Sequence, residues 1–149
     1  MPNLFEASAS GAILTRLEKL QPGAQPQWGK MNAAQMLAHC QVPLQVALGE
    51  KELKQSFMGI LFGRIAKKQI LKDGPVKKNL PTDPSFVVKD ERNFENEKKL
   101  LKALIQRFTV ADSAALAQKK HPFFGYMTAG EWGLLMWKHM DHHLSQFGA

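Results

Sequence analysis

The chain has 149 residues but only one cysteine and no long apolar run. A single cysteine, Cys40, cannot close a disulfide within the chain, which indicates a reduced compartment, with the cytoplasm as the expected location. The longest apolar stretch, residues 57–62, is far below the roughly 20 residues that a membrane span requires. Residues 1–6 have neither a basic start nor an apolar run, so we expect no signal peptide and no transmembrane segment.

Several catalytic and cofactor-binding motifs are also missing from the sequence. It has no glycine-rich phosphate loop, no paired-cysteine motif and no nucleophile elbow, which argues against nucleotide-binding, iron–sulfur and hydrolase functions. Internal repeats and low-complexity tracts are absent as well. With 44% apolar and 22% charged residues, the composition predicts one globular domain spanning residues 1–149.

Positive charge is in excess, and the excess lies in the middle of the chain. Residues 51–107 hold 14 Lys/Arg against 7 Asp/Glu, whereas the remaining residues hold 6 of each. The aromatic residues of this stretch are expected to fit mostly into a core, so stacking with bases, and hence a nucleic-acid partner, is not expected; they are Phe57, Phe62, Phe86, Phe94 and Phe108. An alternative function is an interaction module in which the basic segment 51–78 binds an anionic partner or a membrane surface.

Apolar residues recur at helical spacing along most of the chain, and strand-like alternation is almost absent. The pattern predicts an all-α protein with four principal helices. They are expected near residues 8–20, 32–48, 94–108 and 128–147, with a further short piece at 111–118. Asn32 with Gln35, and Thr128 with Glu131, form predicted capping boxes at two helix starts. Pro43 is expected to kink the second helix.

The segment between the second and third principal helices is predicted to contain a basic amphipathic helix and then an irregular stretch. Over residues 51–72, we expect one apolar face opposite a basic one; the apolar face comprises Phe57, Ile60, Leu61, Ile65 and Leu71. Residues 73–93 have no sustained period and contain three prolines, so a long loop is expected.

Three histidines form the candidate site. His139 and His143 are four residues apart on the last helix and share one face, which continues an apolar stripe toward the interior. Neutral imidazole is a common metal ligand, and His39 on the second helix is the candidate for a third. The residues alone leave two interpretations open: the histidines bind a metal ion, or they are buried core residues that form hydrogen bonds. His142 is a rival to His143, although it projects about 100° away around the helix.

The combination of Trp28, residues 32–39 and a terminal His139-x-x-x-His143-x-x-Gln146 resembles the DinB/YfiT-like superfamily of metal-binding four-helix proteins. Within it, three blocks resemble a bacterial subgroup of unknown function: residues 121–125, 131–133 and 138–148. The resemblance implies a four-helix bundle with an irregular basic insertion between its second and third helices.

The same resemblance implies a function. It places the superfamily's three metal ligands on His39, His139 and His143, binding a divalent ion such as zinc or nickel. It also implies a metal-dependent transferase or isomerase that uses a low-molecular-weight, glutathione-like thiol on a small electrophilic substrate, and a homodimer. No catalytic residue beyond the metal ligands is implied.

Overall fold

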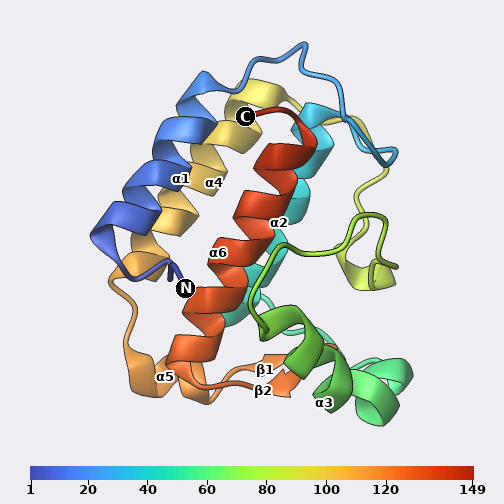
Figure 1. Ribbon diagram of the computed structural model, residues 1–149, viewed down its shortest axis with the longest axis vertical. Coiled ribbons are helices and arrows are strands. Elements are labelled where there is room, and N and C mark those ends of the chain that lie inside the picture. Colours follow the sequence, from blue (N-terminus) through green and yellow to red (C-terminus); the bar gives the residue numbers. More distant parts are fainter.

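The computed structural model describes all residues 1–149 and is predominantly helical (Figure 1). It contains six α-helices, one turn of 3-10 helix and two short strands. The α-helices are α1 (Ala7–Lys19), α2 (Ala33–Ala47), α3 (Phe57–Leu71), α4 (Phe94–Thr109), α5 (Ser113–Ala117) and α6 (Ala129–Gln146), and the other elements are η1 (Pro84–Phe86), β1 (Lys120–His121) and β2 (Gly125–Tyr126).

Four of the helices pack side by side. Helix α1 contacts α4 and α6, and α2 contacts the same two helices (Figure 1). Each contributes fully buried side chains to one continuous apolar core, such as Leu17, Leu37, Leu101 and Met136. Because removing apolar surface from water is the main driving force of folding, this core holds α2 against α6. The candidate histidines lie on these two helices.

Both predicted capping boxes are present. The side chain of Asn32 accepts from the Gln35 backbone N–H and that of Thr128 accepts from the Glu131 N–H, while each partner side chain caps in return. Two otherwise unpaired backbone donors are thus satisfied at each helix start. Pro43 lies inside α2. The expected helix positions agree with the structure to within a few residues, except at α3.

Helix α3 differs from expectation in its start and in its orientation. It begins at Phe57 rather than near residue 51, because the Ser56 side chain accepts from the Gly59 N–H and caps the helix there. The expectation that Phe57 and Phe62 fit into a core was wrong, because Phe57 is 72% exposed and Phe62 48% exposed. The buried face is made by Gly59 and Gly63.

The chain also contains a small antiparallel pair of strands, so it is not strictly all-α. Pro122, Phe123 and Phe124 lie between β1 and β2, and Gly125 has a φ of 75°, which suits glycine. Residues 73–93 are irregular apart from η1, as expected. No helix combines the length and hydropathy that a bilayer span needs.

Candidate metal centre

The three predicted histidines meet between α2 and α6. The Nε2 atom of His39 lies 3.0 Å from the Nε2 of His139 and 3.1 Å from the Nε2 of His143. His39 and His143 are buried, at 4% and 9% exposure, and His139 is half-buried. Together, the three side chains are close enough that they could hold one metal ion.

The orientation of His39 is set by the irregular segment. Its Nδ1 lies 2.8 Å from the backbone oxygen of Phe86 in η1. A carbonyl oxygen can only accept a hydrogen bond, so in this contact Nδ1 carries the proton and donates. In the neutral ring, the Nε2 atom is therefore unprotonated. Its lone pair faces the other two histidines.

His143 is held in the same tautomer by a second chain of contacts. Its Nδ1 lies 2.7 Å from Oε1 of Gln146, and the Gln146 Nε2 donates to the backbone oxygen of Trp28 at 2.7 Å. Because the Trp28 oxygen is an acceptor, the amide must present its own oxygen to His143. Nδ1 of His143 is therefore the donor. The Nε2 atom of His143 is unprotonated as well, and its lone pair points at His39.

His139 has no such partner. Its Nδ1 is buried and makes no hydrogen bond, so only its Nε2 side is engaged. Burial lowers the pKa of His139 well below its ordinary value, and the neighbouring His143 and His39 lower it further. Burial likewise lowers the pKa of His39 and brings that of His143 to about 3. All three rings are therefore neutral at pH 7, which is the ligand form of imidazole.

The separations also fit coordination to a single ion. Imidazole nitrogens bind divalent zinc at about 2.0–2.1 Å, so two of them at angles of about 90–110° are about 2.8–3.4 Å apart. The two distances from His39 fall within this range. Without an ion, lone pairs of two neutral rings would face each other at 3.1 Å, an arrangement that no hydrogen bond between those two atoms can stabilise.

His142 points elsewhere. Its ring packs against Trp28, with centroids 5.4 Å apart, and it is not among the three histidines whose nitrogens converge. The neighbouring charged residues have structural partners: Asp141 forms an ion pair with Arg16 at 2.6 Å, and buried Lys138 donates to the backbone oxygens of Lys72 and Gly74. None of these side chains therefore supplies the missing partner of His139.

Sequence reasoning did not identify the backbone groups that orient the site, because a carbonyl oxygen leaves no trace in the sequence. It also did not predict a structural role for His121. His121 is buried, and its Nδ1 accepts from the N–H groups of Phe123 and Phe124, both at 3.1 Å. Its position directly before Pro122 was the available signal for a turn but not for burial.

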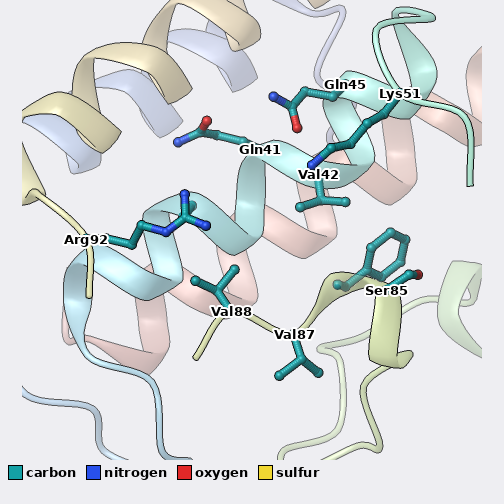
Figure 2. A pocket seen from close by; sticks show the side chains of 10 residues that line it. Gln41, Val42, Gln45, Lys51, Ser85, Val87, Val88 and Arg92 are labelled. Carbon is teal, nitrogen blue, oxygen red and sulfur yellow. The ribbon is translucent and has the colours of Figure 1, made fainter. Parts of the chain in front are cut away.

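A small cavity lies beside the histidines without including them. It measures about 170 Å³ and lies between α2 and the segment 85–92 (Figure 2). Phe86 joins the two places, because its backbone oxygen accepts from His39 while the residue also lines the cavity. The charged side chain of Arg92 at the cavity is bound to Asp90 and Glu97.

Comparison with known proteins gives one match. The sequence profile of a family described as a protein of unknown function, DUF1569, matches residues 4–149. The chain belongs to the DUF1569 family. No curated protein and no solved structure matches it. The matched range contains the three histidines, and also Phe86, Gln146 and Trp28, whose hydrogen bonds orient two of them. Membership of DUF1569 brings no activity with it.

Proposed function

We propose that this DUF1569 protein binds a divalent metal ion through the Nε2 atoms of His39, His139 and His143. The observation that carries the proposal is that the Nε2 atoms of His39 and His143, both unprotonated, lie 3.1 Å apart with their lone pairs facing each other. Both rings commit their Nδ1 protons to fixed acceptors, Phe86 and Gln146. A shared cation would turn this unfavourable contact into two ligand bonds.

The ion belongs to the zinc or nickel class in this proposal. Imidazole ligands suit zinc, copper, iron and nickel, whereas magnesium and calcium prefer oxygen ligands. No carboxylate joins the histidine group, which excludes an oxygen-rich site. Three protein ligands leave further coordination positions for solvent or substrate, as in catalytic rather than structural zinc sites.

For the reaction, we propose metal-dependent transfer of a small thiol to an electrophilic substrate. When bound, such an ion lowers the pKa of a coordinated water or thiol and so makes it a nucleophile at neutral pH. The chain's own part is to hold three neutral imidazoles in place. Buried Cys40 is not the nucleophile in this proposal, because burial raises the pKa of its thiol and it is 1% exposed.

We also propose that the packing of α1, α2, α4 and α6 is that of a DinB/YfiT-like four-helix bundle, formed by a single domain over residues 1–149. Support comes from the contacts of α1 and α2 with both α4 and α6. In such bundles, metal sites are built in the core from side chains on facing helices. The histidines on α2 and α6 follow this rule.

The proposal is tested by measuring the metal content of untagged protein by mass spectrometry, before and after addition of zinc or nickel. We expect about one equivalent in the wild type and loss of it in His39→Ala, His139→Ala and His143→Ala. The matched control is His142→Ala, which removes a histidine from the same helix but not from the converging group. Circular dichroism shows whether each variant is folded.

Two results would count against the proposal. Folded wild-type protein that takes up neither metal would remove the site, and equal loss in His142→Ala would reassign a ligand. A second measurement addresses the reaction: consumption of glutathione in the presence of a model electrophile. We expect turnover by metal-loaded wild type and none by His143→Ala, and a metal-loaded protein without turnover would retain the site but remove the transferase.

A further inference from the structure

The outward face of α3 carries half of the exposed large apolar side chains of the protein. Six large apolar side chains on this one helix are between 48% and 72% exposed: Phe57, Met58, Ile60, Leu61, Phe62 and Ile65. Isolated exposed apolar residues are common on proteins, but a contiguous group of this kind marks an interaction surface. Helix α3 lies at one end of the molecule, beside β1 and β2 and away from α1 (Figure 1).

Close packing on the opposite face holds this orientation. A Cβ added at Gly59 would come within 2.7 Å of the Phe123 backbone oxygen, and one added at Gly63 would collide with the same atom. Turning the helix to bury its large side chains would therefore drive them into the turn between β1 and β2. Just after the C-terminal end of α3, the backbone oxygens of Lys72 and Gly74 accept hydrogen bonds from Lys138. These bonds tie this part of the chain to α6.

The same region carries nearly all of the protein's net charge. Residues 51–78 contain 8 Lys/Arg and 2 Asp/Glu, a balance of +6 within a total of +7. Helix α3 has no acidic residue, and its outward side also carries the exposed Arg64 and Lys68. Apolar side chains beside positive charges that no acidic residue of the same helix offsets are typical of helices that lie in the interface of an anionic membrane.

From these observations, we propose that α3 docks on an anionic phospholipid surface. The apolar side chains of its first turns enter the boundary between headgroups and acyl chains, while Arg64, Lys68 and Lys72 contact lipid phosphates. The protein is held on the membrane surface by this helix and does not cross the bilayer. This proposal is independent of the metal site.

Charge and shape favour lipid over the other occupants of such a surface. A symmetric contact between two copies would bring Arg64 and Lys68 of one α3 close to those of the other, and α3 offers no acidic residue to pair with them. At 100° per residue, the exposed apolar residues spread over an arc of roughly 200°. A protein groove takes a narrow stripe, whereas a fluid lipid boundary can receive side chains over so wide an arc.

The test is co-sedimentation of the full chain with two kinds of vesicle: phosphatidylcholine alone, and phosphatidylcholine with phosphatidylglycerol. We expect binding to the anionic vesicles only, weakened when ionic strength is raised to about 1 M. A Phe57→Ser/Leu61→Ser variant should lower the partition coefficient about tenfold or more, and Arg64→Glu/Lys68→Glu should do the same. All four side chains are exposed, so these variants should stay folded.

Matched controls lie elsewhere on the surface. Val110→Ser changes an apolar side chain that is 84% exposed, and Lys19→Glu reverses an exposed charge on α1; neither should alter binding. Absence of binding to anionic vesicles at low salt would overturn the proposal, and so would binding that the α3 variants leave unchanged. If sedimentation equilibrium shows a dimer that dissociates in Phe57→Ser/Leu61→Ser, without vesicle binding, the face is a contact between copies and the lipid proposal is wrong.

Discussion

The Nε2 atoms of His39 and His143 lie 3.1 Å apart, although each ring already donates its Nδ1 proton to another group. Two hydrogen-bond chains converge here, one from Phe86 in η1 and one from Trp28 through Gln146. They hold both rings in the tautomer that a metal ion requires. The site is thus shaped as much by the groups behind the histidines as by the histidines themselves.

Gln146 is expected to set metal affinity without touching the ion. In Gln146→Leu, the Nδ1 proton of His143 loses its acceptor, so the ring is free to change tautomer and orientation. We expect the dissociation constant for zinc to rise about 10–100-fold, measured by competition with a chromophoric chelator. Gln146→Glu keeps an acceptor for His143 and should recover part of the loss.

The matched control is Gln106→Leu, which removes an exposed glutamine side chain from α4. It should bind zinc as the wild type does. Equal affinity in Gln146→Leu and the wild type would show that the hydrogen bond to His143 has no part in holding the site.

His121 should make folding stability depend on pH. Burial lowers its pKa to about 4, whereas an unfolded chain has an ordinary histidine pKa of about 6.5. Below about pH 6.5, the unfolded state takes up a proton that the folded state does not, so the free energy of unfolding falls as pH drops toward 4. At 1.36 kcal/mol per pKa unit, this contribution amounts to roughly 3 kcal/mol over that window.

His121→Asn isolates this effect. The asparagine oxygen can still accept from the N–H groups of Phe123 and Phe124, but the side chain no longer titrates. Urea unfolding with a chelator present, at several pH values between 7 and 4.5, should give a shallower decline for the variant than for the wild type. The other buried histidines contribute equally to both proteins. Parallel declines would mean that His121 becomes protonated in the folded state without cost.

Two glycine substitutions should have opposite effects on stability. Gly59→Ala places a Cβ against the Phe123 backbone, which cannot move without disturbing the turn, and should lower the free energy of unfolding by about 1–3 kcal/mol. Gly11 lies in α1 with open space around its Cα, so Gly11→Ala should raise it by about 0.5–1 kcal/mol. Urea unfolding at pH 7 measures both. If Gly59→Ala is as stable as Gly11→Ala, α3 does not depend on this close approach.

The positions of the helices could be predicted from the sequence because their signals are local. Asn32 with Gln35, and Thr128 with Glu131, cap their helices through contacts within a single turn. The four-residue spacing of His139 and His143 likewise puts both rings on one face, whatever the helix packs against. These features depend on neighbours in the chain and need no knowledge of the fold.

The orientation of α3 and the tautomers of the histidines were decided only by the tertiary structure. Phe57 and Phe62 of α3 were expected in a core, but Phe123 approaches the helix so closely that only Gly59 and Gly63 fit against it. The acceptors for His39 and for the chain from His143 are backbone oxygens of Phe86 and Trp28, 47 and 115 residues away along the sequence. Every residue type carries such an oxygen, so only the folded chain determines which one meets a given ring.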